Sequence, residues 1–177
     1  MDDDGLMQLA AGGDAAAFGA VVRAHQARLV RFAVRLTGDA DLAQDAVQET
    51  FVRLWRLRTT YKPRGCLQAY LFRTVRSVCL DYARAARPAE ALHDTLEADA
   101  SDPAQLAETR SLADAVQSAV QTLPETQRVV FVLSHYEQLS YTEIADVLGC
   151  PVGTVASRKH QAVESLRRKL FSWKDPI

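Results

Sequence analysis

Apolar residues recur along most of the chain three or four positions apart, which is the spacing of an amphipathic helix. In the first half this pattern predicts three helices: one from about residue 18 to residue 37, one from residue 39 to about 56, and one from about 67 that ends before Pro88. Gly38 suits the end of the first helix, and Asp39 suits the N-cap of the second. No stretch alternates long enough to indicate a strand, so we predict an all-α fold.

The middle of the chain breaks this pattern. Residues 87–102, RPAEALHDTLEADASD, mix proline, alanine and acids without a sustained apolar face, which is typical of a linker. Helical spacing resumes after Asp102-Pro103, and Pro124 opens a further helix. We therefore expect two small helical domains, residues 1–86 and 103–177, joined by a flexible acidic linker over 87–102.

Residues 140–170, SYTEIADVLGCPVGTVASRKHQAVESLRRKL, have the spacing of a helix-turn-helix. Ser140 and Glu143 form the Ser-x-x-Glu pattern of a capping box, which opens a helix. Gly149 suits a left-handed residue at the helix end, and Pro151 prevents continuation. We expect a second helix from about Gly153 or Thr154. Its apolar side should consist of Val155, Ala162, Val163, Leu166 and Leu170.

The opposite side of this second helix carries polar and basic residues, the types that bind phosphates and base edges. With two positions at the start of the first helix, the candidate DNA-binding residues are Ser140, Thr142, Thr154, Ser157, Arg158, Lys159 and Gln161. An ordinary helical hairpin with a solvated basic face is the alternative, since such motifs have false positives.

Charge is distributed unevenly, although the 177 residues sum to a net charge of −1. Residues 1–49 hold eight acids against four arginines, whereas residues 53–87 hold nine basic residues against the single acid Asp81. The basic segment indicates contact with nucleic acid. The near-zero sum predicts weak DNA binding by the chain alone.

Other chemistry is not indicated. The three cysteines, Cys66, Cys79 and Cys150, are far apart and suggest buried thiols, and neither they nor the four histidines form a metal or catalytic cluster. With no Gly-rich phosphate loop and no nucleophile elbow, we expect no enzyme, no cofactor and no metal. The acidic N-terminus and the lack of a long apolar run predict a cytoplasmic protein without membrane insertion.

Both halves together resemble a known family. The matching segments are RLTGD (35–39), AQDAVQETFVRLW (43–55), YLF (70–72) and DYAR (81–84) in the first half, and Leu123-Pro124 through RVVF (128–131) and LSY (139–141) onward in the second. In this order they resemble the sigma factors of bacterial RNA polymerase, of the small extracytoplasmic-function class with only regions 2 and 4. Tyr70 stands where that family usually has Trp, and Ser77 where it usually has Asn.

The resemblance implies a role for each surface. Core RNA polymerase would bind the acidic face of the second helix, through Asp45, Gln48, Glu49, Phe51 and Trp55, although Trp55 also suits core packing. The basic segment would melt and hold the downstream promoter element, and the loop after the second helix would capture a flipped base. The residues implied there are Arg53, Arg56, Thr60, Tyr61, Lys62, Tyr70, Arg73, Arg76, Ser77 and Arg84.

The helix-turn-helix would then read the upstream element in duplex form, so that the chain initiates transcription of a stress- or signal-responsive regulon. The family commonly has an anti-sigma factor as a further partner. Two alternatives remain: a stand-alone helix-turn-helix regulator, which would not need residues 43–55, and an interaction protein that has lost DNA binding.

Overall fold

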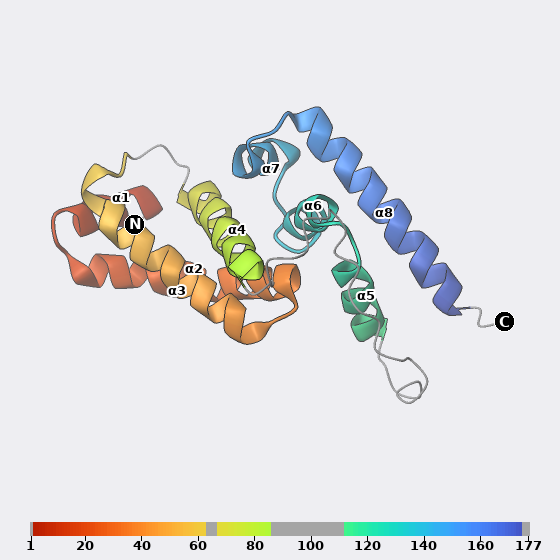
Figure 1. Ribbon diagram of the computed structural model, residues 1–177. Helices are drawn as coiled ribbons and strands as arrows, with labels where there is room; N and C mark the ends of the chain where they lie inside the picture. The colour runs from red at the N-terminus through yellow and green to blue at the C-terminus, as the bar shows by residue number, and fades with distance from the viewer. Residues whose placement is uncertain (1, 63–66, 86–111, 175–177) are drawn as a thin grey trace. The chain divides into compact units, whose positions relative to one another are not determined.

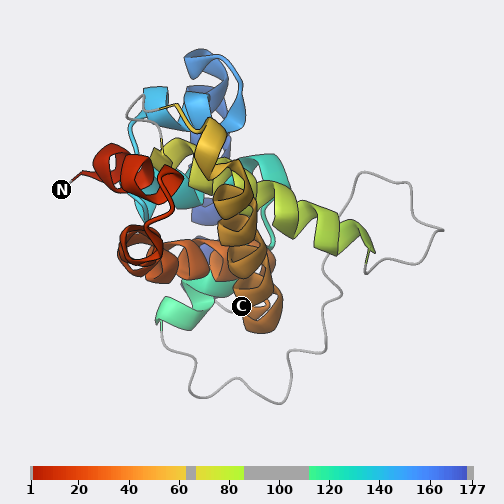
Figure 2. The same ribbon diagram turned by 90° about the vertical axis from the view of Figure 1, so that its left-hand side faces the viewer.

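A computed structural model describes residues 2–62, 67–85 and 112–174 (Figures 1 and 2). Every regular element in these ranges is helical, so the predicted all-α fold is confirmed. The elements are α1 (Asp3–Ala11), α2 (Ala15–Thr37), α3 (Ala40–Leu57), the 3₁₀ turn η1 (Arg58–Thr60), α4 (Leu67–Ala85), α5 (Leu112–Gln121), α6 (Glu125–His135), α7 (Tyr141–Leu148) and α8 (Val152–Lys174).

The chain divides into two compact units. The first contains α1 to α4, and the second contains α5, α6, α8 and residues 141–145 of α7. The expected linker, residues 87–102, lies outside the described residues, as does the expected helix start at Asp102-Pro103. In the described ranges, no helix combines the length and the apolar character that crossing a membrane requires.

In the first unit, α2 packs against α1, α3 and α4, and α3 also packs against α4 (Figure 1). Phe32 of α2 and Phe72 of α4 are almost completely buried, and their rings meet edge to face with centroids 5.0 Å apart. The sequence prediction missed α1, which buries Met7 and Ala10 completely. Only two of its nine residues are buried, so its apolar periodicity is weak.

Local capping sets the boundaries of α2 and α3. The Asp14 carboxylate accepts hydrogen bonds from the amides of Ala16 and Ala17, and that of Asp39 accepts from Asp41 and Leu42. Between the helices, Gly38 has φ of 78° and donates its amide to the Val34 carbonyl. This left-handed residue ends α2 where the sequence predicted.

In the second unit, α8 packs along α5 and α6 (Figure 1). Ile144, Val155, Ala162 and Leu166 are buried as the helix-turn-helix pattern predicted, but Val163 is 42% exposed, so its assignment to the apolar side was wrong. Val163 lies only one residue beyond Ala162, and the 100° step turns it out of the buried stripe.

Two of the three cysteines fall within the described residues. Cys79 on α4 is buried, as predicted, whereas Cys150 after α7 is only half-buried. Cys66 lies outside the described residues. The prediction of buried thiols is therefore confirmed for Cys79 and was wrong for Cys150.

Candidate nucleic-acid interface

The first helix of the helix-turn-helix, α7, opens with a complete capping box. The Ser140 hydroxyl oxygen lies 3.2 Å from the Glu143 amide, from which it accepts a hydrogen bond. The Glu143 carboxylate in turn accepts from the Ser140 amide at 2.8 Å and from the Ser140 hydroxyl at 2.7 Å. Both hydrogens that Ser140 could donate to a phosphate are thus engaged in the cap. Thr142, two residues after Ser140, is exposed.

The turn between α7 and α8 follows the predicted pattern. Gly149 has φ of 63°, a left-handed conformation that an L side chain rarely adopts. The next amide, that of Cys150, donates to the Ala145 carbonyl at 3.2 Å. Pro151 then precedes α8, and its carbonyl accepts from the amides of Thr154 and Val155. The helix therefore starts at Val152, one residue before the earliest predicted start.

The candidate residues of α8 have different surroundings. Thr154, Ser157, Arg158 and Gln161 are spaced to share one face, with Ser157 and Gln161 exposed and the other two half-buried. The Arg158 guanidinium lies 4.0 Å from the sulfur of Cys150. Lys159 is set apart from this face, because its ammonium lies 5.1 Å from the centre of the Tyr141 ring. We therefore describe four residues as the recognition face of α8 and Lys159 as its flank.

In the first unit, five of the ten candidate downstream-element residues line one pocket. It has a volume of about 470 Å³ and lies between the C-terminal half of α3 and α4. Its lining consists of Arg53, Arg56, Leu57, Tyr70, Arg73, Thr74 and Ser77. We call it the basic pocket, because three guanidinium side chains meet one aromatic ring and two hydroxyl groups there.

Arg53 has a carboxylate partner within its own helix. Arg53 donates to the Glu49 carboxylate at 2.8 Å, and this hydrogen bond raises the pKa of Arg53 above its usual value. Arg56 and Arg73 are exposed, and Tyr70 is half-buried. Positive charge and an aromatic face therefore stand at the same opening.

Two lining residues, Leu57 and Thr74, were not among the predicted site residues. Thr74 shares the helical spacing of the apolar residues Leu71 and Val78, which predicts the apolar side of its helix. Its hydroxyl donates to the Tyr70 carbonyl at 2.8 Å. Its place one helical turn from both Tyr70 and Ser77 was the signal that could have found it. Leu57 is 49% exposed at the end of α3, and no pattern in the sequence marked it.

The other predicted downstream-element residues lie elsewhere on the first unit. Thr60 and Lys62 are exposed on and after η1, whereas Tyr61 is half-buried and donates its hydroxyl hydrogen to the Asp4 carboxylate at 2.7 Å. Arg76 and Arg84 are on α4, where Arg84 lies 3.5 Å from the Asp81 carboxylate. The basic segment thus contributes to more than one surface.

The predicted polymerase-binding residues of α3 also separate by environment. Asp45 and Gln48 are exposed, Glu49 pairs with Arg53, and Phe51 is 8% exposed. Trp55 is half-buried, with its ring against Phe18 at 4.9 Å and under the Arg58 guanidinium at 4.0 Å. Trp55 therefore packs on Phe18 but stays half-buried, so it is not the core residue that the sequence favoured.

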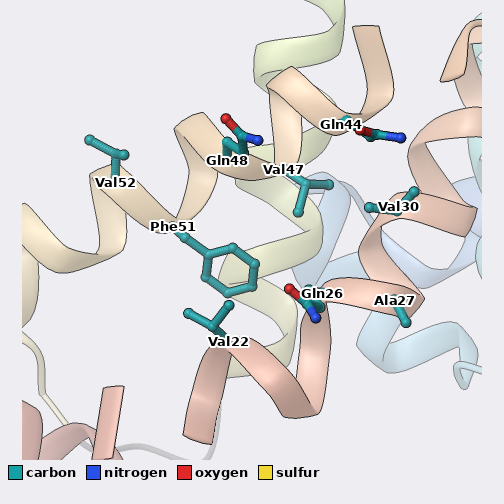
Figure 3. Close-up of a pocket in the computed structure, with 9 residues that line it drawn as sticks. All are labelled: Val22, Gln26, Ala27, Val30, Gln44, Val47, Gln48, Phe51 and Val52. Carbon is teal, nitrogen blue, oxygen red and sulfur yellow. The ribbon is translucent and has the colours of Figure 1, made fainter. Parts of the chain in front are cut away.

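Beside this face, α2 and α3 enclose a larger pocket of about 740 Å³ (Figure 3). Phe51 points across it toward Val22 of α2, and glutamines stand among its apolar residues. The lining consists of Val22, Gln26, Ala27, Val30, Gln44, Val47, Gln48, Phe51 and Val52. We call it the α2/α3 groove. Because Gln48 and Phe51 belong to it, a ligand in the groove would also cover part of the predicted polymerase-binding face.

Metal chemistry finds no support in the described ranges, where no group of three or more His, Cys, Asp or Glu side chains could hold an ion. The basic pocket and the recognition face of α8 consist mainly of hydroxyl, amide, guanidinium and aromatic groups. These groups bind phosphates and bases without changing covalent bonds.

Family models of known proteins match both halves of the chain. A family model described as Sigma-70 region 2 matches residues 21–88, and one described as Sigma-70, region 4 matches residues 113–166. The ECF RNA polymerase sigma factor SigL of Mycobacterium tuberculosis is 36% identical over 168 residues, which are 89% of this chain and 93% of SigL. The ECF RNA polymerase sigma factor SigE of Mycolicibacterium smegmatis is 37% identical over 154 residues, 83% of this chain but 59% of SigE.

Two solved structures resemble the fold. The first is CnrH in complex with the cytosolic domain of CnrY, with a TM-score of 0.73 and 28% identity over 96% of this chain and 97% of CnrH. The second is the sigma factor RpoE in complex with the anti-sigma factor NepR from Bartonella quintana, with a TM-score of 0.67 and 25% identity over 86% and 96% of the two chains.

The fold, the two family matches and the named relatives together define a transcription initiation factor. The chain belongs to the Sigma-70 family and is an ECF-class sigma factor of RNA polymerase, which confers promoter specificity on the enzyme. A stand-alone helix-turn-helix regulator is not favoured, because the match to region 2 covers the half of the chain that such a regulator does not need.

Proposed function

We propose that the two units divide the promoter between them. The first, assigned to residues 1–86, binds core polymerase and holds the downstream element as it melts, and the second, assigned to residues 103–177, reads the upstream element as duplex. The observation that carries this proposal is the basic pocket, because five residues assigned to one task from the sequence line the same 470 Å³ space.

The composition of the basic pocket suits single-stranded DNA. The guanidinium group of Arg56 can follow the phosphates, and the Tyr70 ring offers a face on which an unpaired base can stack. Thr74 and Ser77 supply hydroxyl groups that can hydrogen-bond to base edges. A duplex would leave the aromatic ring unused, so the pocket favours the melted strand.

The recognition face of α8 suits the major groove. A helix fits that groove, and Arg158 and Gln161 carry the donors that distinguish guanine and adenine there. Thr142 stands at a position where its hydroxyl group can donate to a phosphate, whereas the Ser157 hydroxyl already donates to the Thr154 carbonyl at 3.0 Å. We infer that Ser140 serves the fold of this unit, since its donors belong to the capping box.

For core polymerase, the exposed side chains of Asp45 and Gln48 are the supported contact. Glu49 contributes less directly, because its carboxylate already pairs with Arg53. A basic helix on the polymerase would complement Asp45 without having to displace an internal partner.

An anti-sigma factor is the partner that we propose for the α2/α3 groove. Its apolar lining and glutamine rim suit the apolar face of an amphipathic helix. The related RpoE was solved in complex with the anti-sigma factor NepR. Because the groove shares Gln48 and Phe51 with the polymerase-binding face, such a partner would compete with polymerase. The protein would act in the cytoplasm, with polymerase, by binding alone and without catalysis.

The central test is transcription by core polymerase supplemented with the full chain, on a promoter library in duplex form and on the selected promoters with the downstream element already unpaired. Removing the aromatic face (Tyr70→Ala) or one exposed cation (Arg56→Ala) should lower initiation on duplex templates by roughly 5- to 100-fold, equivalent to about 1–3 kcal/mol of lost stacking or phosphate contact. The unpaired template should restore part of the loss, because melting is no longer required.

Arg31→Ala is the matched control, since it removes an exposed arginine from α2 outside the basic pocket. Equal losses for Arg31→Ala and Arg56→Ala would assign the effect to net charge and contradict the pocket. Asp45→Asn should weaken binding to core polymerase, whereas Asp146→Asn in α7 should not. Specific duplex binding without any binding to core polymerase would contradict the division of labour.

A further inference from the structure

The loop that follows α3 is tied to the start of the chain. Tyr61 comes directly after η1, and its hydroxyl donates a hydrogen bond of 2.7 Å to the carboxylate of Asp4 in α1, 57 residues earlier. The ring is half-buried, while its neighbours Thr59, Thr60 and Lys62 are exposed. Tyr61 therefore points toward the body of the unit at the place where the loop presents its other side chains outward.

The helix that accepts this hydrogen bond is itself held in place. Met7 and Ala10 of α1 are completely buried, and α1 packs against both α2 and η1. The Asp3 carboxylate, next to Asp4, lies 2.9 Å from Nε2 of His25 on α2. A carboxylate on a helix anchored at several points is a fixed acceptor, whereas one on a frayed terminus would not restrain its partner.

We infer that Asp4 and Tyr61 are positioning residues that set the geometry of the downstream-element loop. Tyr61 does not serve as the platform for a base: its hydroxyl fixes the loop to α1, and the exposed residues 59, 60 and 62 meet the DNA. The N-terminal helix thereby becomes part of promoter recognition without touching the promoter. This inference rests on the proposed role of the first unit in holding the downstream element.

The rest of the loop is consistent with this arrangement. Two local bonds also shape it: the Tyr61 amide donates to the Arg58 carbonyl at 3.4 Å, and the Thr60 hydroxyl donates to the Leu57 carbonyl at 3.0 Å. Both bonds span three residues and would persist if the loop swung away from the body. The contact with Asp4 is the long-range polar restraint, and losing it should broaden the range of loop positions.

The test uses holoenzyme made from the full chain and core polymerase, with transcription measured from the selected promoter and from templates carrying each single base substitution in the downstream element. The ratio of rates between templates is the readout, because a partly unfolded sample lowers every rate equally and leaves the ratios unchanged. Tyr61→Phe and Asp4→Ala should each reduce the discrimination between bases by roughly three- to tenfold, the size expected for the loss of one typical hydrogen bond.

Further variants distinguish positioning from stacking. Tyr61→Phe combined with Asp4→Ala should have the effect of either change alone, because both remove the same bond. Asp4→Asn keeps an oxygen acceptor and should preserve discrimination, as should Gln8→Ala, which alters an exposed residue of α1. If Tyr61→Phe and Asp4→Ala match the wild type while Tyr61→Ala is defective, the ring is a stacking platform and the inference is overturned. Additive effects in the double variant would also overturn it. Absence of specific transcription by the wild type would instead count against the proposed function.

Discussion

Replacing Ser140 by alanine separates two roles that its hydroxyl group could have. In the structure this hydroxyl accepts from the Glu143 amide at 3.2 Å and donates to the Glu143 carboxylate at 2.7 Å. Alanine removes both hydrogen bonds and leaves the Glu143 amide without its cap. The sequence alone had placed Ser140 among the residues that contact DNA.

The expected cost is that of one N-cap, about 1 kcal/mol, within a range of roughly 0.5–2 kcal/mol. For a unit of this size, such a loss lowers the melting temperature by about 4–8 °C. It hardly changes the folded fraction at 25 °C, because typical domains are stable by about 5 kcal/mol or more. Ser140→Ala should therefore lower thermal stability while leaving the affinity of the folded unit for upstream-element DNA nearly unchanged.

Two measurements on the full chain check this prediction. Circular dichroism during heating gives the stability, and promoter affinity of the holoenzyme at several salt concentrations gives the number of phosphate contacts. Glu143→Ala should cost a similar amount, and the double variant should cost less than the sum because the two side chains cap each other. Glu143→Gln should be the mild variant, since glutamine also completes a capping box.

The reasoning would be refuted if Ser140→Ala left the melting temperature unchanged and reduced the salt dependence of binding. Losing one phosphate contact lowers the slope of log affinity against log salt by about 0.9. That result would return Ser140 to the DNA interface and would mean that the cap contributes little to α7.

Three further outcomes are expected. Burial raises the pKa of the Cys79 thiol to about 12, so at pH 8 only about one part in 10⁴ is thiolate. Mass spectrometry after brief alkylation should therefore find half-buried Cys150 modified before Cys79. The reverse order would contradict the packing of α4. Gly149→Ala should destabilise the second unit by about 1 kcal/mol or more, because position 149 has a left-handed backbone, and Gly149→Asn should destabilise it by less. Equal losses of stability for the two variants in calorimetry would contradict the left-handed conformation as the cause. Phe32→Ala should cost about 3–5 kcal/mol in denaturant unfolding, because it removes a fully buried ring that packs on Phe72, and a cost under 1 kcal/mol would mean that the cavity collapses.

The boundaries predicted from the sequence were most accurate where a local rule sets them. Asp39 caps α3, Gly38 ends α2 in a left-handed conformation, and Ser140 with Glu143 opens α7, all as predicted. Each of these features depends on residues within a few positions, so the sequence contains all the information. The expected helix from residue 18 in fact starts at Ala15, because the Asp14 cap was not used in the prediction.

Exposure was predicted less well where the partner comes from far along the chain. Periodicity assigned Val163 to the buried side of α8 and Thr74 to the apolar side of α4, yet the first is exposed and the second lines the basic pocket. Helical spacing indicates the direction in which each side chain points, but not how much of the helix surface a neighbouring helix covers. α1 was missed for a related reason, since its burial depends on α2 rather than on its own pattern.

The sequence by itself determined the all-α fold, the helix-turn-helix with its cap and turn, the concentration of positive charge in residues 53–87, and membership in the sigma-factor class. These properties follow from periodicity, local capping and motif order, which all depend only on the order of residues along the chain. Only the tertiary structure decided which basic residues share a pocket and that Tyr61 is held by Asp4. Packing joins Tyr61 to a residue 57 positions earlier, and the spacing of residues along a chain does not encode which of its helices become neighbours.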